Sequence, residues 1–114
     1  MEGIVLVRGK PKSGLLVRFM PDPNRGNDLP INSMGETDGQ GKYELQYTHE
    51  GQQGLGAPIG WHRVLIEDTA MARVPQEKKP PPRLIPRVYN SPATTPLVKE
   101  IVSGSQTIDL EIGL

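Results

Sequence analysis

The sequence contains no cysteine, few aromatic residues and no excess of charge of either sign. The absence of cysteine excludes disulfides, thiol catalysis and cysteine-ligated metal. Thirteen basic residues balance thirteen acidic ones, so no net field attracts nucleic acid or an anionic membrane. We therefore expect no nucleic-acid partner.

Long hydrophobic runs are also missing. No apolar stretch approaches the roughly 20 residues of a membrane-spanning helix, so we expect no transmembrane segment. Nothing resembling a signal peptide separates Met1 from the first apolar run. If Met1 begins a trimmed mature domain, we expect the protein in the cell envelope or secreted. If Met1 is the native start, we expect it in the cytoplasm.

Glycine and proline are abundant instead. Thirteen Gly and twelve Pro make up about a fifth of the 114 residues, above the roughly 12% usual for this pair. They lie between short apolar runs, which is typical of many short strands joined by turns. The chain length suits one domain, residues 1–114. The composition predicts a single all-β domain.

The stretch 37–47 shows the strand pattern most clearly. A glycine-containing turn leads into Tyr43, Leu45 and Tyr47, which alternate with polar residues, as in a strand with one apolar face. The strand that follows from Trp61 carries bulky residues on both faces, which favours a central position. Seven strands are expected in an antiparallel Greek-key β-sandwich: 3–8, 15–20, 31–36, 42–48, 61–68, and 97–102 with 107–112 as a hairpin.

The segment 69–96 holds seven of the twelve prolines and is predicted to be a loop. Residues 84–90 have enough apolar content to pack back onto the sandwich. Pro80, Pro81 and Pro82 could dock in an aromatic groove of a partner protein. The alternative, a stiff connector, is the one that we favour.

Several short motifs follow one another along nearly the whole chain: Gly9-Lys10-Pro11-x-x-Gly14, Val17-x-Phe19-x-Pro21, Thr37-Asp38-x-x-Gly41-x-Tyr43-x-Leu45, Gly60-x-His62-x-Val64-x-Ile66 and Ile85-Pro86-x-x-Tyr89-Asn90. In this order they resemble the carboxypeptidase regulatory-like, transthyretin-like (prealbumin-like) β-sandwich. More narrowly, they resemble the version found in small secreted proteins and lipoproteins of planctomycete bacteria. The resemblance implies a seven-stranded sandwich in the cell envelope without enzymatic activity of its own.

Candidate metal and catalytic residues are sparse. Asp38 stands in a glycine turn, but a calcium loop needs about 6–8 converging oxygens, so we interpret it as a turn. The polar loop 22–28 offers more oxygens, although a solvated loop is the better interpretation. His49 and His62 are the two histidines, and His62 is expected to be a packed strand residue. We expect no metal, no cofactor and no catalytic residue.

Two related sandwiches with chemistry of their own fit poorly. The transthyretin-related hydrolases end in a Tyr-Arg-Gly-Ser signature, which is absent here. Pilin-type sandwiches need a first-strand Lys and a last-strand Asn for an isopeptide bond, and this chain has neither. A cluster of both histidines with an Arg would nevertheless favour the hydrolase.

The expected function is that of a non-enzymatic accessory or interaction module that binds a protein or envelope component. Free edge strands would also allow a weak homodimer. The alternative is a domain that binds carbohydrate or another small ligand. An exposed Trp61 beside a polar hollow would favour this alternative, whereas we expect Trp61 to be buried, because the core needs the few aromatics present.

Overall fold

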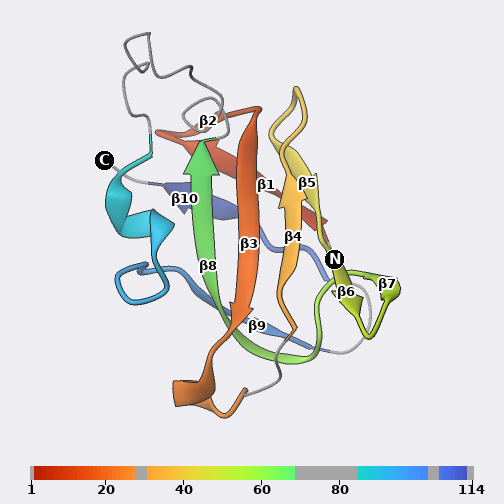
Figure 1. Cartoon of the computed structure of the whole chain (residues 1–114). Coiled ribbons are helices and arrows are strands. Elements are labelled where there is room, and N and C mark those ends of the chain that lie inside the picture. The colour runs from red at the N-terminus through yellow and green to blue at the C-terminus, as the bar shows by residue number, and fades with distance from the viewer. Residues whose placement is uncertain (1, 28–30, 69–84, 103–105, 113–114) are drawn as a thin grey trace, which may run out of the picture.

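The computed structural model describes residues 2–27, 31–68, 85–102 and 106–112. Within these ranges ten strands form two sheets, one of four strands and one of six (Figure 1). The prediction of an all-β sandwich is confirmed. The structure has three strands more than the seven expected, because it contains two additional short strands and one expected strand is divided into two.

The smaller sheet is built around β1 (Glu2–Val7). On one side β1 pairs in parallel with β10 (Leu110–Ile112). On the other side it pairs antiparallel with β2 (Lys10–Pro11) and with β5 (Lys42–Glu44), each covering a different part of its length. β1, near the start of the chain, therefore lies directly beside β10, near its end.

The larger sheet is antiparallel throughout and has the order β7-β6-β4-β3-β8-β9. The longest strand, β8, lies between two neighbours, as the bulk on both of its faces predicted. The strands are β3 (Leu15–Pro21), β4 (Ser33–Glu36), β6 (Gln46–His49), β7 (Gln52–Leu55), β8 (Gly60–Asp68) and β9 (Val98–Ile101).

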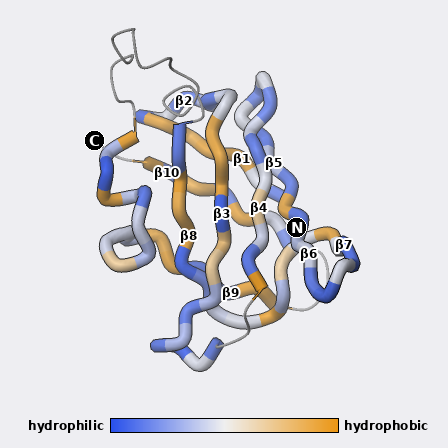
Figure 2. Tube along the Cα trace, viewed as in Figure 1, coloured by the Kyte–Doolittle hydropathy of each residue, from blue (hydrophilic) through white to orange (hydrophobic). Residues whose placement is uncertain are grey.

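The core lies between the two sheets. Alternate residues of a strand face the same side, so β3 contributes Leu15, Val17 and Phe19, while Val5 and Leu110 come from the opposite sheet. All five have 0% exposed surface. Each such side chain contributes about 1.5–3 kcal/mol by leaving water. Figure 2 shows hydrophobic stretches along β1, β3, β8 and β10, the strands that enclose this core.

The expected strand 42–48 is divided between the two sheets. Its first part is β5 and its second part is β6, with Leu45 at the crossing. A side chain at Gly35 would collide with the Glu44 carbonyl, so glycine lets β4 pass close to the crossing. Tyr43 and Leu45 are each 1% exposed and fill the core as predicted, whereas Tyr47 beyond the crossing is only partly buried.

The expected hairpin of 97–102 with 107–112 is wrong. β9 pairs with β8 in the larger sheet, and β10 pairs with β1 in the smaller one. The prediction that Ile108, Leu110 and Ile112 face the core is nevertheless correct, since these side chains are 8%, 0% and 1% exposed. Their alternation identifies the buried face of a strand, but it contains no information about which strand lies beside it.

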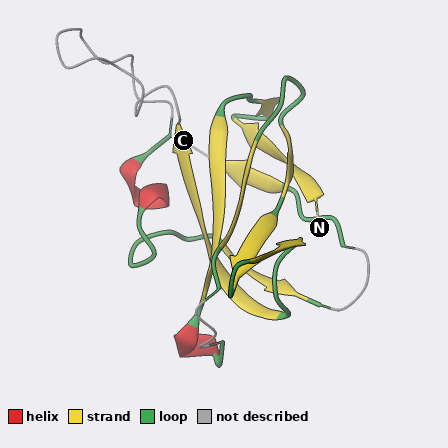
Figure 3. Cartoon of the chain, turned by 45° about the vertical axis from the view of Figure 1, so that its right-hand side comes forward, coloured by secondary structure: helices red, strands yellow, loops and turns green. Residues whose placement is uncertain are grey.

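Two 3₁₀ turns lie outside the sheets (Figure 3). The first, η1 (Pro23–Arg25), follows β3, and the second, η2 (Arg87–Asn90), packs against β8. Residues 84–90 were expected to pack back, and Ile85 and Tyr89 are indeed buried in the core. Pro80, Pro81 and Pro82 lie outside the described residues.

Candidate functional site: a polar hollow beside β8

The site begins where β3 ends. Asp22 follows Pro21 and caps η1: its Oδ1 accepts a hydrogen bond from the Asn24 backbone N–H at 3.2 Å. Gly26, with φ of 85°, ends the turn in the left-handed region that favours glycine. Asp22 is only 2% exposed, so the expectation of a solvated loop is wrong at this residue.

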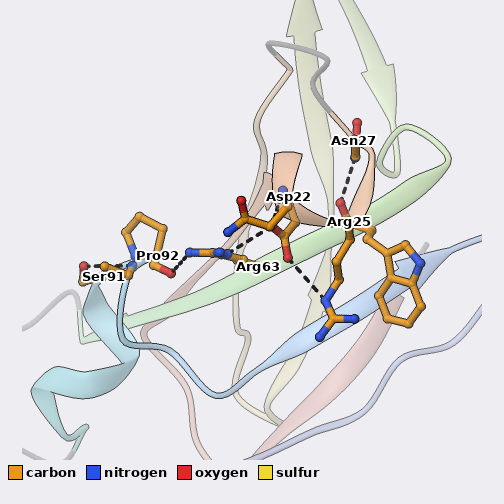
Figure 4. A network of polar contacts seen from close by, with 9 residues as sticks. Asp22, Arg25, Asn27, Arg63, Ser91 and Pro92 are labelled. Atoms are coloured by element: carbon orange, nitrogen blue, oxygen red, sulfur yellow. Dashed lines mark hydrogen bonds and ion pairs between the residues drawn. The ribbon is translucent and has the colours of Figure 1, made fainter.

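Two arginines neutralise the buried carboxylate of Asp22 (Figure 4). The Nε of Arg63 on β8 lies 3.2 Å from Oδ1, and the Nε of Arg25 on η1 lies 3.5 Å from Oδ2. Arg63 also donates from Nη1 to the carbonyl of Pro92 at 2.6 Å. The network thus joins the end of β3, the middle of β8 and the turn after η2, and it carries one positive charge in excess.

The network borders an open hollow of about 500 Å³. Its polar side is formed by Asp22, Arg25 and Arg63, and Pro92, Ala93 and Val98 lie on it as apolar residues. Thr95 fixes the turn against β8, because its Oγ1 donates to the Val64 carbonyl at 2.7 Å. The hollow therefore combines cationic donors with an apolar surface.

Trp61 lies next to this network and is half-buried, so the expectation that it belongs to the core is wrong. Strand alternation explains the difference, since His62 takes the inward position and Trp61 therefore faces outward. The Arg25 guanidinium lies 5.1 Å from the centre of the Trp61 ring, a cation–π contact. The Trp61 carbonyl accepts from Asn27 Nδ2 at 2.8 Å and from the Asp22 N–H at 3.0 Å.

His62 is fully buried and packs against Phe19, with ring centres 5.9 Å apart. Its Nε2 donates to the Pro58 carbonyl at 2.8 Å. Burial lowers the pKa of His62, and the hydrogen bond to Pro58 opposes this to a smaller extent. His62 is a neutral core residue, as expected from its place in the strand.

The two histidines are not brought together. His49 lies at the exposed end of β6, where its Nε2 is 3.7 Å from the Glu50 carboxylate, and β4 and β3 separate β6 from β8. The hydrolase alternative required both histidines beside an Arg, and this arrangement lacks that cluster. Within the described ranges, no group of three or more His, Asp or Glu side chains is arranged to hold a metal ion.

Asp38 stands in a turn, as predicted, and this turn leads from β4 of the larger sheet to β5 of the smaller one. The Asp38 Oδ1 accepts from the backbone N–H of Gln40 at 2.9 Å and of Lys42 at 3.0 Å. Gly41 takes a φ of 76°, and its N–H donates to the Asp38 carbonyl at 2.9 Å. The Asp38 carboxylate thus accepts hydrogen bonds from the backbone of its own turn.

The grouping of Asp22, Arg25 and Arg63 was not predicted from the sequence. A local signal was present: an Asp before Pro, followed by Gly26, is typical of a capped turn closed in the left-handed region. The third member could not be found this way, because Arg63 reaches Asp22 only through the antiparallel pairing of β3 with β8.

A second hollow, of about 450 Å³, lies over β4 and β5 and has the opposite charge. Among the described residues on its lining, one is basic, Lys42, and four are acidic, Glu2, Glu36, Asp38 and Glu44. An anionic ligand would therefore be repelled there and attracted to the hollow beside β8.

No helix in the described part of the chain is long and apolar enough to span a membrane. In comparisons with known proteins, no protein-family model, no curated protein and no solved structure matches the chain.

Proposed function

We propose that the chain is a non-enzymatic interaction module, an accessory domain of a bacterial cell-envelope or secreted protein, and that it docks by strand addition at β7. The ordered sequence motifs support the cell-envelope setting. The single observation that carries the docking mode is the edge of the larger sheet: β7 is a terminal strand with neither charge nor proline, Gln52-Gln53-Gly54-Leu55.

Backbone groups of β7 are available at this edge. In the β6–β7 hairpin the hydrogen-bonded pairs alternate along the ladder. Gly56 donates to the Leu45 carbonyl at 2.6 Å, so Gly54 and Gln52 also bond inward to β6. The N–H and carbonyl groups of Gln53 and Leu55 therefore point outward, where an added strand would meet them.

Other sheet edges in the described residues are protected in the usual ways. β9 carries Lys99 and Glu100, and β2 contains Pro11. β5 carries Lys42 and Glu44, and β10 carries Glu111. Charged residues and proline discourage pairing between sheet edges. β7 has neither device, and its Leu55 is 80% exposed. An unprotected edge that ends in an exposed leucine is typical of a strand that pairs with another chain.

The added strand that we propose is β7 of a second copy. A two-fold axis at Gly54 sets Gln53 of one copy opposite Leu55 of the other. The outward N–H and carbonyl groups of these two residues then form two hydrogen bonds with each other. The exposed leucine then packs beside an uncharged glutamine. Because the chain has a formal net charge of zero, two copies do not repel each other at neutral pH.

Replacing Gln53 by proline tests this mode without opening the β6–β7 ladder, because the lost N–H points outward. Gln53→Ala is the matched control, since it keeps the N–H. In sedimentation equilibrium up to about 1 mM, the range of weak specific association, the parent and Gln53→Ala should dimerise and Gln53→Pro should stay monomeric. A monomeric parent, or a Gln53→Pro variant that dimerises equally well, would refute the proposal.

One observation favours a second candidate function, the binding of a small ligand. Trp61 is partly exposed, and its ring contacts Arg25, which lines the polar hollow. The Arg25 guanidinium covers one face of the Trp61 ring, however. The ring is therefore better suited to hold Arg25 in place than to stack on a neutral sugar.

A further inference from the structure

We propose that the hollow beside β8 binds a small organic carboxylate, held by the guanidinium groups of Arg25 and Arg63. The inference rests on the second candidate function and names its ligand class. It is independent of the β7 edge, so each can fail without the other.

The charges of the hollow are the first argument. Asp22 supplies one negative charge, and Arg25 and Arg63 supply two positive ones around it. The chain as a whole is balanced, so this excess of one positive charge is local. Because Asp22 is 2% exposed, its charge fixes both guanidiniums from below and leaves the outer side of the pair to solvent. A monovalent anion would complete the balance.

Unused hydrogen-bond donors are the second argument. A guanidinium has five N–H groups in one plane. Within the part of the chain that the structure describes, Arg63 uses its Nε toward Asp22 and its Nη1 toward Pro92, and Arg25 uses its Nε. The remaining terminal N–H groups match the paired oxygens of a carboxylate, which arginine binds in a bidentate manner.

The rigidity of the two arginines is the third argument. Arg25 is held by its contact with Asp22 and by the Trp61 ring, and Arg63 is held through its Nε and its Nη1. A long flexible side chain normally loses about 0.5–1.5 kcal/mol of free energy when binding immobilises it. Here most of this ordering takes place when the protein folds, which favours binding.

The apolar surface decides the kind of anion. Pro92, Ala93 and Val98 also line the hollow, whose volume of about 500 Å³ is typical of small-molecule sites. A bare ion such as phosphate leaves this surface in contact with water. An organic acid with an apolar body covers it, and the burial adds about 25 cal/mol per Å².

Benzoate is a suitable probe, benzamide is its neutral counterpart of equal shape, and inorganic phosphate is an anion without an apolar body. Each is titrated into the isotope-labelled chain while the N–H signals, including those of arginine Nε, are followed by NMR. We expect benzoate to shift the Arg25 and Arg63 Nε signals saturably. Benzamide should leave them unchanged, and phosphate should bind more weakly, by roughly threefold, because the apolar contact is missing.

Two pairs of variants locate the site. Arg25→Gln should weaken benzoate binding at least about tenfold, the usual effect of losing a charged hydrogen bond, while Arg87→Gln, an exposed arginine on η2, should not. Ala93→Glu places a carboxylate on the rim and should abolish binding, and Ala93→Gln should retain most of it. Ala93 is exposed, so neither change at this position threatens folding.

Each outcome decides the inference. Equal binding of phosphate and benzoate would overturn the organic-acid class, and binding of benzamide or a neutral sugar in the hollow would overturn the charge argument while keeping a ligand-binding function. Absence of binding by all probes would overturn both the inference and the second candidate function. Retained benzoate binding in Ala93→Glu would show that the site lies elsewhere.

Discussion

At the scale of single residues, His62 links the core to the protonation state of the protein. Its ring is fully buried beside Phe19, and its Nε2 proton is used by the Pro58 carbonyl. The Nδ1 atom is buried and has no hydrogen-bond partner among the described residues. A proton added at Nδ1 would place a positive charge in the core, away from water. This loss of solvation lowers the pKa of His62.

This burial predicts an acid-sensitive fold. The folded pKa of His62 lies below its unfolded value of about 6.5, so the unfolded chain takes up the proton first as pH falls. The free energy of unfolding should be level above about pH 7 and fall as the pH decreases through about 6.5. Urea denaturation between about pH 7.5 and about pH 5.5 measures the effect, in a range above most carboxyl pKa values.

Two variants assign the slope to His62. His62→Gln, although less stable overall, should lose most of the pH dependence in this range, because no group at this position can titrate. His49→Gln, which removes an exposed histidine, is the matched control. A slope that survives in His62→Gln would contradict this account.

At the scale of elements, the two-residue hairpins show how much backbone geometry matters. Glu50 and Gly51 join β6 to β7 with φ values of 52° and 80°. Arg8 and Gly9 join β1 to β2 with φ of 53° and 78°. Two successive residues of positive φ are typical of the type I′ turn, which suits the twist of a hairpin and favours Asn-Gly. In both hairpins the first residue is an ordinary side chain in a strained region.

Substitutions in the Glu50–Gly51 turn should therefore change stability in opposite directions. Glu50→Asn should raise the free energy of unfolding by up to about 1 kcal/mol, because asparagine tolerates the left-handed region. Gly51→Ala should lower it by about 1–2 kcal/mol through backbone strain alone. A Cβ at Gly51 would meet nothing within 4 Å, so no steric clash confuses the comparison. Equal midpoints in urea for both variants would contradict the turn assignment.

The same hairpin shows where sequence reasoning reaches its limit. β7 has the sequence Gln52-Gln53-Gly54-Leu55, with neither β-branched residues nor clear alternation, so it is not among the strands expected from the sequence. Its pairing depends on the turn and on contact between Gly54 and the Tyr47 ring, where a larger residue would clash. By contrast, β3 and β8 alternate strongly around a buried face, and their positions and inward residues were predictable from the sequence.

At the scale of the whole molecule, the features that could not be predicted from the sequence all depend on pairing between distant segments. The expected last hairpin is instead shared between the sheets, with β9 beside β8 and β10 beside β1. The Tyr43 hydroxyl reinforces the second placement by donating to the Ile108 carbonyl at 2.6 Å. The arginine pair of the hollow likewise depends on the meeting of β3 with β8, so the sequence contained its parts without their arrangement.

The larger sheet also gives the molecule two different ends. The β9 side carries the charged network and its hollow, and the β7 side carries an uncharged edge with an exposed leucine. Four strands, β6, β4, β3 and β8, lie between β7 and β9. This separation would allow a ligand at one end and a second strand at the other without direct competition.

The most direct test of the proposed interaction module is amide hydrogen exchange along β7 as protein concentration increases. If β7 pairs with a second copy, the N–H groups of Gln53 and Leu55 should become protected at high concentration. The N–H groups of Gln52 and Gly54, already bonded to β6, should exchange at the same slow rate throughout. Fast exchange of Gln53 and Leu55 that does not change with concentration would contradict the account.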